Sequence, residues 1–251
     1  MFAKLALTLM LTVLMLSAGG NSKRRIDSDP FDEVIPQFVF GGGWHTSVSI
    51  TNMEDSPVTI PINFYQGDGQ AWQVPIVGKG TASTHSFVIP AKGTVFFETP
   101  DDVAALQQGW ALLEIPCCPD VVGFAVFRQR VPGRPDFEAV VPFADSFEGR
   151  STMIFDNTRG FVTGIAIVNP REFGGTTFTL VFRDEGGNRF HLDQITLGRL
   201  QKQVFVLSDR FPQTAGRRGS IEFQGVSSYI AGLGLRFNPG GAFTSFHTFE
   251  P

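Results

Sequence analysis

The most regular feature of the chain is an alternation of apolar and polar residues in short runs. In "HTSVSIT" (residues 45–51), Val48 and Ile50 fall on one side and two serines on the other. The run "VTIPINF" (residues 58–64) repeats this alternation. Successive side chains of a strand point to opposite faces, so a period of two predicts strands that are buried on one face.

Similar runs follow along the chain, with turn residues between them. Glycines in "GDGQ" and "EGGN" supply the positive φ angles that hairpin turns need. One segment, "DDVAALQQ" (Asp101 to Gln108), predicts a helix with an aspartate cap and a single apolar face. The further predicted strands cover residues 71–77, 85–89, 93–98, 110–115, 121–130 and 136–142, then 163–168, 176–183, 189–196, 202–207, 219–224, 229–237 and 242–248.

The second half of the chain repeats the first. "GGWHTSVSITN" (residues 42–52) aligns with "RGFVTGIAIVN" (residues 159–169), which pairs Thr46 with Thr163. Colinear matches follow, and they pair Phe64 with Phe182, Phe96 with Phe205, Gly123 with Gly232 and Phe137 with Phe243. One unit of about 105 residues has been duplicated, which is the kind of internal period that marks a repeated domain.

The glycine run "GGG" before Trp44 raises the question of a phosphate-binding loop. Of this run, the second copy keeps only Gly160, although the strand after it persists. No Lys-Ser/Thr pair follows the glycines, and a strand rather than a helix comes next, contrary to a P-loop. The run therefore marks the entry into a strand.

These patterns predict an all-β chain: two tandem homologous antiparallel β-sandwich (immunoglobulin-like) domains after an N-terminal signal peptide. About seven short strands in each unit, with a turn every eight to twelve residues or so, are typical of a sandwich. The predicted divisions are a signal peptide (1–20), a polar linker (21–33), a first sandwich (34–148) and a second sandwich (149–251).

The N-terminus has the order of an export signal. One lysine precedes an apolar run from Leu5 to Leu16, and small residues follow, as before a cleavage site. The run is short for a membrane-spanning helix, whereas the basic residues Lys23 to Arg25 oppose translocation. We expect a secreted, periplasmic or cell-surface protein, attached to a membrane only if the signal segment stays uncleaved.

The motifs also resemble a known group of proteins. "GGGW-x-T", "FY-x-x-DG", "GWA" and the closing "GLGLRFNPGGAFTSF" occur in this order over residues 36 to 249. Their arrangement resembles a poorly characterised family of secreted bacterial tandem β-sandwich repeat domains. The resemblance implies a bacterial, extracellular protein, often an appendage of a larger one. It brings no catalytic residues.

The composition narrows the function. The formal net charge is -4, and no aromatic platform accompanies the few clustered arginines, so we expect no nucleic-acid partner. The four histidines form no HxH or HExxH pair, and no G-x-S-x-G sequence occurs, so we expect no metal, no cofactor and no enzymatic activity.

Two sets of residues stand out as candidate sites. Trp44, Trp72 and Trp110 are a possible ligand face for sugars, although a tryptophan in an alternating run is more often core. Cys117 and Cys118 are the only cysteines and are adjacent. They are a possible vicinal disulfide, with turn filler or a bond to another chain as alternatives.

The leading hypothesis is a non-enzymatic extracytoplasmic interaction or structural module that binds a protein or polysaccharide surface through sheet faces, sheet edges or loops. One alternative is a carbohydrate- or surface-ligand-binding protein that uses exposed aromatics. Another is a periplasmic chaperone-like protein, a class whose two sandwich domains pair an arginine and a lysine in the interdomain cleft and donate an edge strand.

Overall fold

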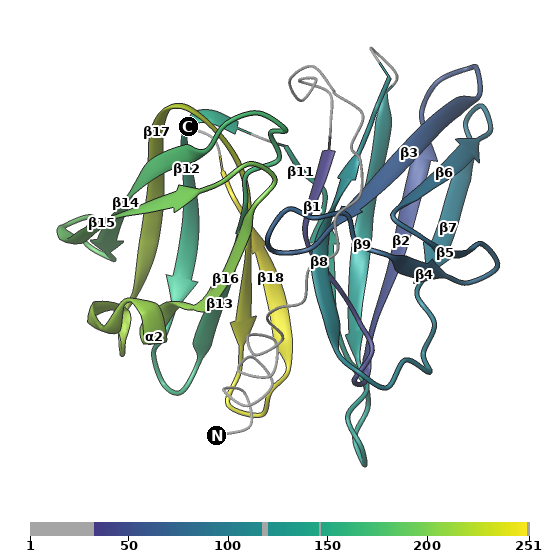
Figure 1. The fold of residues 1–251 in the computed structure, drawn as a ribbon. Coiled ribbons are helices and arrows are strands. Elements are labelled where there is room, and N and C mark those ends of the chain that lie inside the picture. The colour runs from purple at the N-terminus through teal and green to yellow at the C-terminus, as the bar shows by residue number, and fades with distance from the viewer. Residues whose placement is uncertain (1–32, 117–119, 146, 250–251) are drawn as a thin grey trace.

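The chain folds into two β-sandwiches that lie side by side (Figure 1). A computed structural model describes residues 33–116, 120–145 and 147–249. The predicted signal peptide, residues 21–32 of the linker and both cysteines lie outside these ranges. The all-β fold class with antiparallel sheets, predicted from the alternating runs, is confirmed.

The first sandwich consists of two sheets. Sheet A has the strand order β11-β1-β8-β3-β6, and sheet B has the order β10-β9-β2-β7. The bounds are β1 (Glu33–Phe40), β2 (Trp44–Asn52), β3 (Val58–Tyr65), β6 (Thr84–Ile89), β7 (Thr94–Glu98), β8 (Gln107–Leu113), β9 (Val121–Gln129), β10 (Phe137–Pro142) and β11 (Ala144–Asp145). A separate two-stranded ribbon joins β4 (Val74–Ile76) to β5 (Gly80–Ala82).

The second sandwich has the same strand order. The long strand β17 (Arg218–Phe237) runs through both of its sheets: its first half pairs with β12 and β14, and its second half with β13 and β18. Sheet A′ is β12-β17-β14-β15 and sheet B′ is β18-β17-β13-β16. The remaining bounds are β12 (Phe147–Asp156), β13 (Val162–Val168), β14 (Thr176–Asp184), β15 (Arg189–Leu197), β16 (Lys202–Val206), α2 (Leu207–Arg210), a 3₁₀ turn (Pro212–Thr214) and β18 (Phe243–His247).

Each strand of the second sandwich thus has a counterpart in the first. β12, β13, β14, β15, β16 and β18 correspond to β1, β2, β3, β6, β7 and β10, while β17 corresponds to β8 and β9 together. In both units the first strand pairs with the same partner: β1 pairs with β8, and β12 pairs with the first half of β17. This order differs from the ABED and CFG sheets of immunoglobulin constant domains.

Matched polar residues make the same contacts in both units. The hydroxyl of Thr46 donates to the carbonyl of Val39 at 2.6 Å and accepts from its N–H at 3.3 Å. Thr163 has the same two bonds with the backbone of Asp156, both 3.0 Å long. Each threonine therefore ties the first strand of its unit to the second, across the two sheets.

The pairing also corrects two registers of the sequence alignment. Val48 lies opposite Phe97, and its counterpart Ile165 lies opposite Phe205, so Phe205 corresponds to Phe97 and not to Phe96. Likewise Phe243 corresponds to Glu138 and not to Phe137. A slip of one residue turns each side chain to the other face of the sheet. The first error arose because the adjacent Phe96 and Phe97 match Phe205 equally well, and the second because Phe243 was matched to Phe137 by residue type.

One further prediction is wrong, and two strands were not predicted. Residues 101–106 form turns and irregular backbone instead of a helix, and Gln107 and Gln108 already belong to β8. The N–H of Gly42 donates to the carbonyl of Val103 at 3.0 Å, so this segment is a loop that packs against the glycine run.

The strands β1 and β12 were missed. "EVIPQFVF" is apolar on both faces and contains Pro36, so it lacks the alternation that signals a strand.

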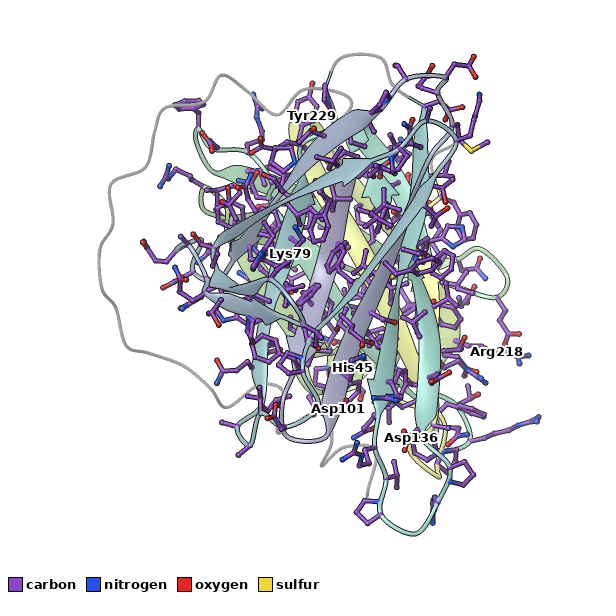
Figure 2. The ribbon with its side chains drawn as sticks, turned by 90° about the vertical axis from the view of Figure 1, so that its right-hand side faces the viewer. His45, Lys79, Asp101, Asp136, Arg218 and Tyr229 are labelled. Atoms are coloured by element: carbon purple, nitrogen blue, oxygen red, sulfur yellow. The ribbon has the colours of Figure 1, made fainter. Side chains whose placement is uncertain are left out.

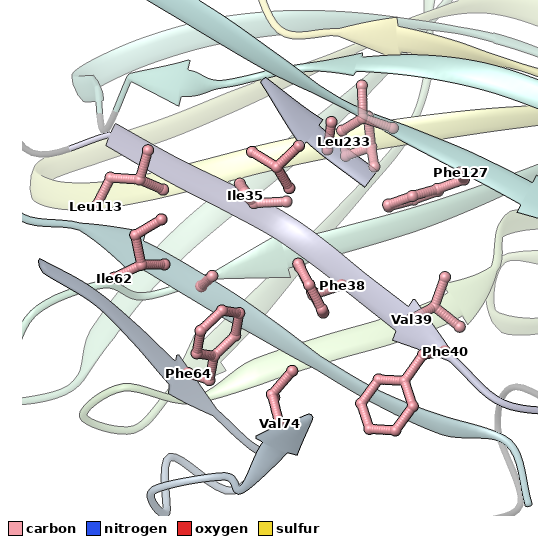
Figure 3. Packing of buried hydrophobic residues seen from close by; sticks show 14 of the residues in the cluster. Ile35, Phe38, Val39, Phe40, Ile62, Phe64, Val74, Leu113, Phe127 and Leu233 are labelled. Carbon is pink, nitrogen blue, oxygen red and sulfur yellow. The ribbon is translucent and has the colours of Figure 1, made fainter. Parts of the chain in front are cut away.

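The two sandwiches share a continuous apolar interior. One core cluster contains residues of sheets A and B and also outward-facing residues of sheet B′. Figure 3 shows Leu233 of β17 among residues of the first sandwich such as Ile35 and Phe127. A smaller cluster joins Val34, Trp110 and Leu112 to Val168, Leu200 and Ala231. The outer face of sheet A therefore packs against the outer face of sheet B′.

Candidate functional site

The candidate site is the outer face of sheet B. The alternation that buries Val48 and Ile50 in the core turns the intervening residues of β2 outward. Cross-strand partners lie on the same face of a sheet. We call this surface the β2 face. It consists of Ser47, Ser49 and Thr51 of β2, Thr94, Phe96 and Glu98 of β7, Val122, Phe124 and Val126 of β9, and Val140 of β10.

Large apolar side chains are exposed on the β2 face. Phe96 is 76% exposed, Val140 52%, Val122 51% and Phe124 43%. Phe96 and Phe124 both pair with Ser49, one from each neighbouring strand. Because adjacent strands lie about 4.8 Å apart, the two rings flank the serine about 10 Å from each other. The small residues of β2 therefore form a shallow channel, with the apolar ridge of β9 on one side and Phe96 of β7 on the other.

One end of the β2 face is charged. His45 continues the outward row of β2, with Nδ1 3.1 Å from Asp101 and Nε2 3.4 Å from Glu98. Arg128 donates to both carboxylate oxygens of Asp101, at 2.7 and 2.9 Å. This hydrogen bond, aided by the charges of Arg128, His45 and Arg130, holds the pKa of Asp101 below its usual value. His45, Asp101 and the nearby Asp136 lie toward one end of the molecule in Figure 2.

An apolar centre bordered by charges is the usual anatomy of a protein–protein interface. The largest exposed apolar patch on a soluble monomer is commonly functional. The β2 face therefore has the properties of a docking surface. Its arrangement lacks the concave, mostly enclosed shape of a small-molecule site.

The corresponding face of the second sandwich is buried. We call it the β13 face: Gly164, Ala166 and Val168 of β13, Val204 of β16, Ala231, Leu233 and Leu235 of β17, and Ser245 of β18. Ala166 is flanked by Val204 and Leu233, as Ser49 is by the two phenylalanines. Sheet A covers this face, and only a void of about 10 Å³ remains there, beside Gln37.

A buried lysine lies at the edge of the β13 face. The Lys202 ammonium donates to the side-chain oxygen of Gln37 and to the backbone carbonyl of Gly109, both in the first sandwich. Burial lowers the pKa of Lys202 well below its usual value, because a charged amine is poorly solvated there. These bonds, with the one from Trp110 Nε1 to the carbonyl of Leu200 at 3.2 Å, fix the two sandwiches against each other.

The second sandwich carries an open hollow of about 400 Å³ beside β12. Its charged residues are already paired. Arg236 donates to Asp156 at 2.7 and 3.0 Å, and Arg218 lies 2.6 Å from Glu185. The guanidinium of Arg236 also stacks 3.4 Å from the centre of the Phe161 ring. The hollow is therefore bordered by ion pairs that stabilise the fold.

The three tryptophans do not form an exposed face. Trp44 and Trp72 are 4% exposed and Trp110 is 0% exposed. Trp44 packs on Phe243, Trp72 stacks on Phe40, and Trp110 stacks on Tyr65. The rings fill the first sandwich and its junction with the second, so they are core residues and do not form the possible sugar-stacking face.

Sequence reasoning missed Phe96 and Phe124 as candidate residues. In "TVFFE" and "VVGFAVF" they occupy the outward positions of alternating strands. The correct register of these strands would have identified both phenylalanines as exposed.

Over the described ranges, no three histidine, cysteine or acidic residues are grouped as a metal site would require. Within the same ranges, none of the helices has the length and apolar character to cross a membrane.

Comparisons with known proteins do not assign a family. No family model matches the chain, and no curated protein matches it. Among solved structures, the chain is similar to the crystal structure of the Pseudomonas aeruginosa CupB2 chaperone, with 9% identity and a TM-score of 0.18. The match covers 82% of this chain and 93% of that chain. A TM-score of this size establishes no shared fold.

Proposed function

We propose that this protein is a non-enzymatic interaction module that binds another protein through the β2 face. The observation that carries the proposal is the exposure of Phe96 and Phe124 on either side of Ser49. The matching positions of the second sandwich are covered by a sheet of the same chain. A face of this kind is therefore a surface that this fold uses for packing, and in the first sandwich it is open.

The proposed setting is outside the cytoplasm. The apolar run from Leu5 to Leu16, followed by small residues, supports export. Two sandwiches fixed to each other give a rigid platform, which keeps the entropic cost of binding low.

The two alternatives receive less support. The carbohydrate-binding reading relied on the tryptophans, which are buried. The chaperone-like hypothesis requires an arginine and a lysine that are accessible in the interdomain cleft. Lys202 lies between the two sandwiches, but Gln37 and Gly109 enclose it.

One observation favours edge-strand pairing: β15 pairs with β14 on one side, and its Leu192 is 49% exposed. Pairing of β15 with an added extended peptide would be visible as new amide protection along Arg189–Leu197 in hydrogen exchange.

Site-specific photo-crosslinking in the expressing cell tests the main proposal. A benzophenone side chain replaces Phe96 in one variant and Gln194, an exposed polar residue of β15, in the control. We expect a discrete adduct from position 96 that is absent from position 194, with its partner identified by mass spectrometry. The absence of any adduct from position 96, or the same adducts from both positions, would refute the proposal.

A further inference from the structure

We propose that the protein forms a symmetric dimer in which the β2 faces of two copies pack against each other. This inference rests on the proposed function, because it assigns an occupant to the same surface. The first support is the shape of the surface. Ser47, Ser49 and Thr51 form a channel one strand wide, and the apolar side chains of β9 form a ridge directly beside it.

A surface with one ridge and one channel is complementary to itself. When a second copy is related by a two-fold axis, the β9 ridge of each copy, centred on Phe124, enters the β2 channel of the other. Residue i of one copy then contacts residue j of its partner and the reverse, as in every isologous interface. Sheets pack about 10 Å apart with strands rotated by about 30°, a distance that apolar side chains from both faces fill.

The duplicated architecture shows what covers such a face. On the β13 face the cover is the outer face of sheet A, to which Trp110 and Leu112 contribute. In this fold, the outer face of sheet B′ is therefore buried beneath another apolar sheet face. The second copy offers two candidates for that cover, its sheet A′ and its own β2 face.

Sheet A′ is unsuited to this task. The positions that correspond to Trp110 and Leu112 hold Ser220 and Glu222. Glu222 pairs with Arg150 at 2.8 Å and with Arg183 at 3.4 Å on that surface. Burial of these ion pairs would cost more than the contact gains. Packing of sheet A′ of one copy on the β2 face of the next is therefore disfavoured. Packing of one β2 face on the other is favoured, and it gives an assembly of two copies.

The charges around the face agree with this arrangement. The row that contains His45 and Arg128 lies four residues from the row of Ser49 and Phe124. It therefore falls at the rim of the interface. Glu98 lies closer to the centre, opposite Ser47 on the edge strand β7. A four-stranded face measures about 15 Å by about 20 Å, so its footprint on two copies together is about 600 Å². An interface of this size belongs with weak, transient contacts, and we expect a dissociation constant in the micromolar range.

Sedimentation equilibrium of the purified full chain tests the dimer. We expect the mass to rise from one chain to two between about 1 and about 300 μM. Phe124→Lys places a charge in the centre of the interface and should raise the dissociation constant at least tenfold. Ile154→Lys, on an exposed residue of β12 in the second sandwich, is the matched control and should dimerise as the wild type does. Circular dichroism melting verifies that both variants are folded.

Three outcomes would overturn the inference: a monomer at every concentration, a Phe124→Lys variant that dimerises like the control, or assembly beyond two copies. The crosslinking experiment separates this failure from failure of the proposed function. An adduct of position 96 with a different protein would leave the binding function intact and refute the dimer. An adduct of twice the chain mass supports both.

Discussion

Phe124 on β9 and Leu233 on β17 hold equivalent positions in the two sandwiches, yet Phe124 is 43% exposed and Leu233 is 2% exposed. Each pairs with the same position of its second strand, Ser49 in one unit and Ala166 in the other. The difference arises because sheet A of the same chain covers Leu233, whereas within the described residues the β2 face has no such cover. The residue types of the central strands agree with this difference in exposure: hydroxyl side chains line the open β2 face, whereas glycine and alanine line the buried β13 face.

Truncation of the neighbours Phe96 and Phe97 should change the free energy of unfolding by very different amounts. Phe97 is 5% exposed and stacks on Phe87 at 4.4 Å between ring centres, so Phe97→Ala should lower the free energy of unfolding by about 3–5 kcal/mol. Phe96→Ala should change it by less than about 0.5 kcal/mol. Urea unfolding followed by tryptophan fluorescence measures both. Equal losses would mean that the register of β7 is wrong.

Each of the matched threonines should contribute separately to stability. Thr46→Val and Thr163→Val leave a buried backbone N–H and a carbonyl without their side-chain partner, so each should cost about 1–3 kcal/mol. Thr51→Val is the control, because its hydroxyl bonds to Thr94 at the surface. Thermal unfolding compares the three variants. A loss at Thr51 as large as at the other two positions would contradict the assigned role.

Lys202 should make the free energy of unfolding increase as the pH rises toward 10.5. The folded pKa is depressed and the unfolded pKa is near 10.5, so between these values the unfolded chain binds one more proton. Stability should therefore rise with pH across this window, by up to about 1.4 kcal/mol per pH unit. Lys202→Met lacks this rise, and its stability relative to the wild type should fall toward pH 10.5. The exposed Lys92→Met is the control. Parallel pH profiles for wild type and Lys202→Met would show that the amine is not buried.

Asp156 should contribute stability that is lost in acid. Burial alone would raise its pKa, but hydrogen bonds from Thr158 and Arg236 outweigh burial and leave the pKa below 3.8. The contribution is complete above the unfolded pKa and disappears as the pH falls through the folded pKa. Asp156→Asn should lose about 1 kcal/mol at pH 7 and match the wild type near pH 2, measured by urea midpoints. A difference that persists in acid would assign the effect to packing.

Much of the fold could be predicted from sequence because a half-buried strand carries its own signal. β2, β3 and β13 to β16 alternate or are bounded by glycine turns, and their predicted limits fall within about two residues of the observed ones. β1 gave no such signal because it is buried on both faces, with Val34 and Ile35 both at 0% exposure. The burial of Lys202 had no local signal, since the residues around it in the chain do not show that the other sandwich encloses it.

The sequence by itself determined the alternating strands, their inward sides and the repeated unit, because these depend on residues close together in the chain. It did not determine which outward faces are covered. β2 and β13 have nearly the same pattern, and only the packing of one sandwich on the other buries the β13 face and leaves Phe96 and Phe124 exposed. That choice depends on contacts between residues a hundred or more positions apart, such as Lys202 with Gln37, which a local period does not encode.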